Sequence, residues 1–207
     1  AMSVDTEAGL VYIPTQESPL IFAIADEWKQ FSSYKRNPGR WNIGLEMGRL
    51  AQLFIDNVAE QPTPGGALKA FDPLTGETKW TVRNPYYWNG GVLATSGGLV
   101  FQGDAAGMFS AYDKENGDLL WQFNTYTSML APPVTFQLDD TQYVSVLTGG
   151  GGADLFGGET ETASTKYGNL GRLLVFKIGG NEKLPVPNAI DRIIPQQSVV
   201  VVSENII

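Results

Sequence analysis

The sequence AFDPLTGETKW at residues 70–80 returns 41 residues later as AYDKENGDLLW at residues 111–121. In both copies an Asp is followed four positions later by Gly and eight positions later by Trp. A repeat of about 40 residues made of short β-prone runs is typical of a β-propeller, in which each repeat forms one blade. The Asp and the Gly suit a hairpin turn, because Asp accepts hydrogen bonds from nearby backbone and Gly tolerates a positive φ. The repeat therefore predicts an all-β fold of the propeller type.

One complete blade is predicted between residues 91 and 123, where β-prone runs alternate with turn residues. From the innermost strand to the outermost, the expected strands are residues 92–94, 99–102, 108–112 and 119–123. Similar runs at residues 9–13 and 142–147 occupy the place of a second strand. We therefore expect a part-blade on each side of the complete one. The repeated Trp80 and Trp121 fall on outer strands, where an aromatic ring can pack between neighbouring blades.

The long loops of the chain are expected on one rim of the propeller. Antiparallel strand order puts the loop between the second and third strands of every blade on the same rim, and the Asp-x-x-x-Gly turns on the other. This loop is short in the complete blade, at residues 103–107, and is expected to be long at about residues 15–66 and 149–171. Long loops on one face of a rigid scaffold often carry function. Residues 1–180 are thus expected to form blades, and residues 181–207 a linker and C-terminal tail.

Composition excludes several classes of function. The net charge of −8 argues against a nucleic-acid partner. The sequence has no apolar run near the roughly 20 residues that a membrane-spanning helix needs. Cys and His are both absent, so these residues hold no disulfide, no Cys-x-x-Cys-His haem attachment, no Ser-His-Asp triad and no zinc site of the usual kind.

Four further stretches carry a family resemblance: WNGGVLAT at residues 88–95, GGLVFQG at 97–103, APPVT at 131–135 and GRLLVFK at 171–177. They closely resemble the C-terminal blades of alcohol dehydrogenases that depend on pyrroloquinoline quinone (PQQ), and the likeness extends over roughly residues 1–187. The resemblance implies an eight-bladed propeller of which this chain supplies about the last three blades. It also implies PQQ and Ca²⁺ on the channel axis, with the catalytic residues and the calcium ligands outside this chain. Haem c would belong to a following domain or to a partner.

The function that the resemblance implies is that of a periplasmic, PQQ- and calcium-dependent dehydrogenase. Such an enzyme oxidises alcohols or polyols to aldehydes or ketones and passes electrons to a cytochrome c. The implied partners are the remaining propeller blades, the cytochrome and a small alcohol or polyol. The alternative is a non-catalytic propeller that uses PQQ-type repeats as a scaffold for protein–protein interaction. The glycine-rich stretches argue against this alternative, because a pure scaffold would not need them.

The first candidate for cofactor binding is Asn89, with Trp88 and Gly90 beside it. In methanol dehydrogenases, which this family resembles, a Trp fills the aligned position next to PQQ. The glycines that follow allow a close approach of backbone to a ligand. We expect Asn89 to contact the cofactor, while Trp88 is either a cofactor contact or a core residue.

The second candidate is the glycine-rich loop of Gly150, Gly151, Gly152 and Ala153. Its backbone amides suit an anionic planar cofactor, although a flexible loop without any ligand has the same composition. Leu155 and Phe156 are expected to form part of the apolar wall of a substrate channel. The aromatic residues of the first insertion could cover the funnel, dock a cytochrome or form a small local core, of which the last is favoured; they are Trp28, Phe31, Tyr34 and Trp41.

Overall fold

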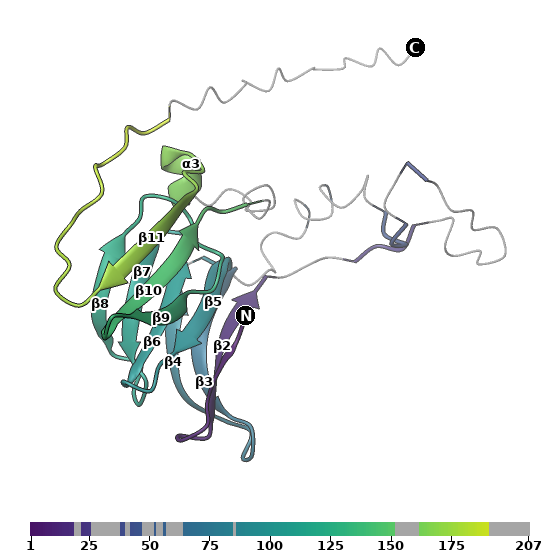
Figure 1. Cartoon of the computed structure of the whole chain (residues 1–207). Helices are drawn as coiled ribbons and strands as arrows, with labels where there is room; N and C mark the ends of the chain where they lie inside the picture. Colours follow the sequence, from purple (N-terminus) through teal and green to yellow (C-terminus); the bar gives the residue numbers. More distant parts are fainter. Residues whose placement is uncertain are drawn as a thin grey trace, which may run out of the picture.

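A computed structural model of the protein describes residues 1–18, 22–25, 38–39, 42–46, 52, 56, 64–84, 86–151 and 162–190. These residues form three antiparallel sheets that lie side by side, as Figure 1 shows. None of the helices in this part of the chain is long and apolar enough to cross a membrane. The predicted all-β fold is therefore confirmed for the described residues.

The first sheet has the strand order β1-β2-β3-β4. Its strands are β1 (Ser3–Asp5), β2 (Leu10–Glu17), β3 (Gly65–Asp72) and β4 (Glu77–Asn84). The sequence predicted only a part-blade here, which was wrong, because the short β1 completes a four-stranded sheet by pairing Val4 with Val11. Strands β2 and β3 also run further than expected, so their connection covers residues 18–64.

The second sheet is the predicted complete blade, with the order β5-β6-β7-β8. Its strands are β5 (Asn89–Ala94), β6 (Leu99–Asp104), β7 (Met108–Asp113) and β8 (Leu119–Asn124). The repeat is also visible in the irregularities of the two sheets. The strand register shifts between Ala70 and Phe71 in the first sheet, and at the equivalent Ala111 and Tyr112 in the second.

The third sheet has three strands among the described residues, in the order β11-β10-β9. They are β9 (Val134–Leu138), β10 (Thr141–Thr148) and β11 (Arg172–Lys177). The short helix α3 (Ala163–Tyr167) lies in the connection between β10 and β11. The part-blade predicted after the complete blade is thus confirmed within the described residues.

Both long connections leave from one rim, which we call the upper rim. In Figure 1 the β1–β2 and β3–β4 turns lie at the lower rim, while α3 and the end of β2 lie at the upper rim. The chain beyond β11 runs back along the third sheet, and the backbone N–H of Ile190 donates to the carbonyl oxygen of Lys166 in α3 at 2.8 Å. Both long connections thus begin at the same rim, while the predicted insertions at about residues 15–66 and 149–171 stay a prediction.

Two apolar layers hold the three sheets together. The layer between the first and second sheets consists of Tyr12, Leu68, Ala70, Trp80, Val92 and Val100. The layer between the second and third sheets is built around Phe109, Met129 and Val146, with Leu174 and Phe176 packed against them. Each layer joins one sheet to the next, so every sheet packs against a neighbouring sheet through apolar side chains.

Trp80 joins the first sheet to the turn at residues 113–117 of the second sheet. Its indole Nε1 donates to the carbonyl oxygen of Lys114 at 3.1 Å, and the hydroxyl of Tyr12 donates to the same oxygen at 3.1 Å. Lys114 also forms a 2.8 Å ion pair with Asp5 in the β1–β2 turn. The indole lies so close to Gly117 that a Cβ there would be 2.8 Å from Trp80 Cε3. The predicted packing of Trp80 between blades is confirmed.

Trp121, the equivalent residue of the second sheet, has a different environment. Its ring makes edge contacts with Phe176 at 5.4 Å and with Phe109 at 5.9 Å between ring centroids. Its side chain is 39% exposed, against 9% for Trp80. Among the described residues, no fourth strand follows β11, so the third sheet offers no turn equivalent to residues 113–117.

The contact between Trp80 and Gly117 can be tested with two equivalent glycines. Gly76 and Gly117 have nearly the same φ, 77° and 80°, but only Gly117 lies against a neighbour. Gly76→Ala should cost about 1 kcal/mol from the left-handed backbone alone. Gly117→Ala should cost about 1–3 kcal/mol more, because its Cβ displaces the indole. The measurement is the midpoint of chemical unfolding of both variants, and equal shifts would contradict the role given to Trp80.

Candidate functional site

Asn89 lies at the upper rim, where β5 begins, and its side chain links two sheets. The side chain is 8% exposed. Its Nδ2 donates to the carbonyl oxygen of Thr15 in β2 at 2.9 Å and to that of Tyr87 at 3.3 Å. Its Oδ1 accepts a hydrogen bond from Gln102 Nε2 at 3.2 Å. The side chain therefore fixes the start of the second sheet against the first.

Gln102, in β6, was not singled out by the sequence analysis. It is 5% exposed, and its Nε2 donates both to Asn89 Oδ1 and, at 3.1 Å, to the carbonyl oxygen of Gly90. We call Asn89 and Gln102 the amide pair. The sequence contained one indication of this role, a Gln within the otherwise apolar strand Leu99–Gly103. A Gln that is buried in such a strand must find hydrogen-bond partners.

The glycines beside Asn89 are required by the packing of the protein itself. A Cβ on Gly90 would lie 2.9 Å from the carbonyl oxygen of Gly103, and a Cβ on Gly91 would lie 2.7 Å from Cβ of Pro132. The glycines in the sequence predict close approach of a ligand here, whereas the structure shows neighbouring protein atoms in that space. A contact of Gly90 with a cofactor stays a prediction.

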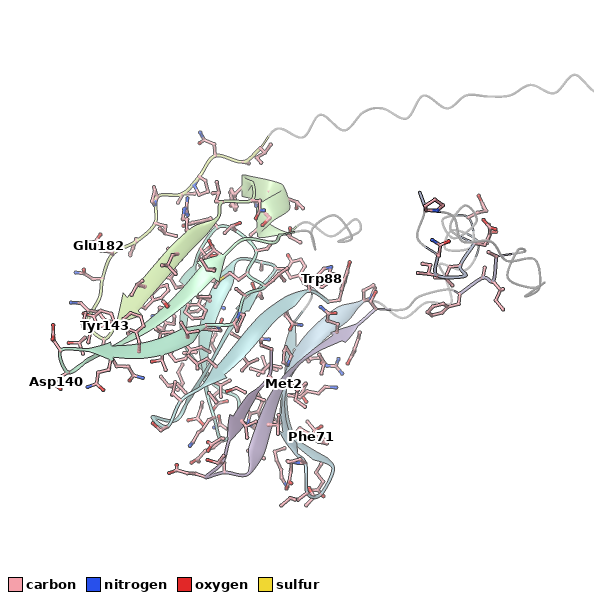
Figure 2. All side chains as sticks on the ribbon, turned by 45° about the vertical axis from the view of Figure 1, so that its right-hand side comes forward. Met2, Phe71, Trp88, Asp140, Tyr143 and Glu182 are labelled. Atoms are coloured by element: carbon pink, nitrogen blue, oxygen red, sulfur yellow. The ribbon has the colours of Figure 1, made fainter. Side chains whose placement is uncertain are left out.

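Trp88 carries a buried donor that has no partner among the described residues. Its indole Nε1 is inaccessible to solvent and makes no hydrogen bond there, while the ring lies 5.5 Å from the ring of Tyr87 between centroids. Figure 2 shows Trp88 at the upper rim, beside the place where the chain leaves the first sheet. A buried N–H without an acceptor costs about 1–3 kcal/mol. Such a donor is suited to an acceptor atom of a bound molecule.

The glycine-rich loop begins in an ordered way after β10. The N–H of Gly149 donates to the carbonyl oxygen of Ser128 at 2.8 Å, and the N–H of Gly150 donates to Asn169 Oδ1 at 2.9 Å. Both amides therefore have protein acceptors, and a cofactor contact of Gly150 would not use its N–H. Gly151 is exposed, with a φ of 55°. The predicted sites at Gly152, Ala153, Leu155 and Phe156 lie outside the described residues, as do Trp28, Phe31, Tyr34 and Trp41.

The segment 128–130 lies between the two candidate stretches. Gly91 N donates to the carbonyl oxygen of Leu130 at 3.2 Å, and Met129 forms a parallel bridge with Gly149. The hydroxyl of Ser164 in α3 accepts a 2.9 Å hydrogen bond from Ser128 N. The segment 128–130 thus contacts the WNGG stretch, the start of the glycine-rich loop and α3.

Asp104 is a partly buried carboxyl next to this site. It pairs with Asn89 across the β5–β6 ladder, and its Oδ1 accepts from Met108 N at 2.8 Å in the β6–β7 turn. Burial raises the pKa of Asp104 to about 6, although hydrogen bonds from backbone N–H groups of the same turn act in the opposite direction. Within the described part of the chain, no group of three or more His, Cys, Asp or Glu residues could hold a metal ion.

The raised pKa of Asp104 gives the fold a testable pH dependence. The folded state binds this proton more tightly than the unfolded state, so stability should increase as the pH falls from 7 towards 5. Asp104→Asn removes the titration and keeps an acceptor for Met108 N. The stability of the wild-type protein relative to this variant should rise by about 1 kcal/mol between pH 7 and pH 5.

Chemical unfolding of both proteins at the two pH values measures this difference. Asp5 and Asp72 do not confuse the result, because hydrogen bonds hold the pKa of each below its usual value and their titration falls at lower pH. Parallel pH profiles of the two proteins would show that the Asp104 carboxyl is not perturbed.

Comparison with known proteins shows which family this chain resembles. Residues 82–144 match the family model of the glucose/ethanol/alcohol dehydrogenase β-propeller domain, which is named for PQQ. The chain is 40% identical over 190 residues to quinohemoprotein alcohol dehydrogenase ADH IIB of Pseudomonas putida, covering 90% of this chain and 25% of that protein. It is 36% identical to the dehydrogenase subunit of the quinone-type alcohol dehydrogenase of Gluconobacter oxydans, covering 91% of this chain and 25% of that subunit.

The structural comparison agrees. The crystal structure of quinohemoprotein alcohol dehydrogenase from Comamonas testosteroni superposes with a TM-score of 0.69 at 31% sequence identity, covering 89% of this chain and 26% of that one. The chain spans about a quarter of the length of the curated relatives that it matches. Along about 90% of its length the chain is therefore similar to part of the β-propeller of PQQ-dependent alcohol dehydrogenases.

Proposed function

We propose that the complete protein is a periplasmic, PQQ- and calcium-dependent dehydrogenase that oxidises alcohols or polyols to aldehydes or ketones. A cytochrome c is its proposed electron acceptor. The similarity that extends along 90% of the chain to a quinohemoprotein alcohol dehydrogenase carries this proposal. No observation on the described residues favours the alternative of a non-catalytic scaffold.

The residues at the upper rim fit a planar, anionic ligand such as PQQ. Trp88 offers a buried indole N–H without a protein acceptor, which suits a carboxylate or carbonyl oxygen of the cofactor. Asn89 is held in place beside it by Gln102 and Thr15. When bound, PQQ supplies the two-electron acceptor for alcohol oxidation. The role we assign to residues 88–90 is to bind and orient the cofactor.

The catalytic residues and the calcium ligands are assigned to the parts of the protein outside residues 1–207, as the family resemblance implies. Gly151 and the residues that follow it are assigned to a second wall of the cofactor site. Leu155 and Phe156 are assigned to the substrate channel. Any haem c would be carried by another domain or by a partner protein.

The remaining propeller blades are the proposed partners of the third sheet. Its side facing away from the second sheet is apolar and exposed, and the strand registers place the following residues on it: Val134, Phe136, Leu147, Leu173 and Val175. Phe136 stacks on Tyr143, labelled in Figure 2, with ring centroids 5.3 Å apart. An apolar face of this kind is what a neighbouring blade buries in a propeller.

Reconstitution of the complete apo-protein tests the proposed function. With PQQ and Ca²⁺ added, the protein should reduce an artificial electron acceptor when primary alcohols, secondary alcohols or polyols are supplied. Omission of PQQ should abolish the activity, because PQQ is the group proposed to take the two electrons from the alcohol. Activity with a lanthanide ion but not with Ca²⁺ would overturn the calcium assignment alone. Absence of activity with every alcohol and both metals would overturn the proposed function.

A further inference from the structure

Gln102 sits behind the candidate cofactor site, at a place where the strand ladder is interrupted. The β5–β6 register pairs Asn89 with Asp104 and resumes with Val92 opposite Gln102. Between these pairs lie Gly90 and Gly91 on β5 but only Gly103 on β6. Such a bulge weakens regular backbone pairing. The side chain of Gln102 supplies a donor to the Gly90 carbonyl at this point.

The amide pair uses all of its N–H groups within the protein. Gln102 Nε2 donates to Asn89 Oδ1 and to the Gly90 carbonyl, and Asn89 Nδ2 donates to the carbonyls of Thr15 and Tyr87. Each of these amide nitrogens carries two hydrogens, so none is left for a ligand. The indole N–H of Trp88, next in sequence to Asn89, is buried and has no acceptor in the described residues.

We propose that Gln102 is a positioning residue for the PQQ site, acting through Asn89 and Gly90 to hold the indole N–H of Trp88 where an acceptor atom of the cofactor meets it. This inference rests on the proposed function and assigns Gln102 no contact with the ligand. Gln102 is buried, and it acts through its two hydrogen bonds, to Asn89 Oδ1 and to the Gly90 carbonyl oxygen. Without its donors, Asn89 Oδ1 and the Gly90 carbonyl lose the partners that hold the bulge.

The experiment is a double-mutant cycle in the complete apo-protein, with PQQ as the probe and Ca²⁺ present. The variants are Gln102→Leu, Trp88→Phe and the two combined. Gln122→Leu is the matched control, because Gln122 Nε2 also makes a hydrogen bond in the second sheet, to Ser110 Oγ at 3.1 Å. The readouts are the dissociation constant of PQQ by equilibrium dialysis and the thermal unfolding midpoint of each apo-protein.

We expect Gln102→Leu and Trp88→Phe each to weaken PQQ binding about tenfold, and the double variant to bind within about threefold of Trp88→Phe alone. Gln122→Leu should leave PQQ binding unchanged. A residue with a merely structural role would lower the unfolding midpoint without this non-additivity. Equal effects of Gln102→Leu in both backgrounds, or unchanged binding by Gln102→Leu, would overturn the positioning role.

Gln102→Glu keeps the test decisive if the leucine variant does not fold. The ionised carboxylate can only accept hydrogen bonds, whereas the protonated form regains one donor. PQQ binding by this variant should therefore recover as the pH is lowered, relative to the wild-type protein, and a constant ratio would count against the proposal. Failure of the wild-type protein to bind PQQ would overturn the proposed function together with this inference. If the wild-type protein binds PQQ, the variants test the role of Gln102 alone.

Discussion

The arrangement of the first two sheets depends on the packing of Trp80 onto the turn at residues 113–117. Two hydrogen-bond donors from the first sheet, the Trp80 indole and the Tyr12 hydroxyl, converge on the carbonyl oxygen of Lys114. The turn can receive them because Asp113 Oδ1 accepts from Glu115 N at 2.7 Å and Gly117 adopts a positive φ. The same few residue types therefore form the turn inside one sheet and the attachment between two sheets.

Because the same residues form both the hairpin turn and the contact between two sheets, the repeat predicted much of the fold. A pattern of Asp, Gly and Trp that recurs after 41 residues carries both the hairpin and the contact between blades. The short β1 was missed although it pairs with the neighbouring β2, because it is only three residues long and further contacts come from distant residues. The N–H of Val92 donates to the carbonyl oxygen of Ala1 at 3.1 Å, and Ala94 N donates to Ser3 Oγ at 2.9 Å. Contacts of this kind leave no periodic signal in a run of three residues.

The candidate site was only half visible in the sequence. The resemblance pointed to Trp88 and Asn89, and a burial argument was available for Gln102. The link from Asn89 to Thr15 spans 74 positions and depends on how the first sheet meets the second, which no local pattern encodes. The glycines illustrate the opposite error: Gly90 suggested room for a ligand, but the carbonyl oxygen of Gly103 takes that room. A glycine in the sequence indicates that another atom lies close to the backbone, but it does not show whether that atom belongs to the protein or to a ligand.

The site lies on the contacts that join the sheets, and this has a thermodynamic consequence. Asn89 ties the second sheet to the first, while the segment 128–130 ties it to the start of the glycine-rich loop and to α3. A ligand that accepts the Trp88 N–H satisfies a donor which the protein alone leaves unpaired. Since a molecule that binds only the folded state stabilises it, cofactor binding at this rim would also strengthen the seam between blades. The hydrogen bonds around this site would then contribute both to the affinity for the cofactor and to the attachment of one sheet to the next.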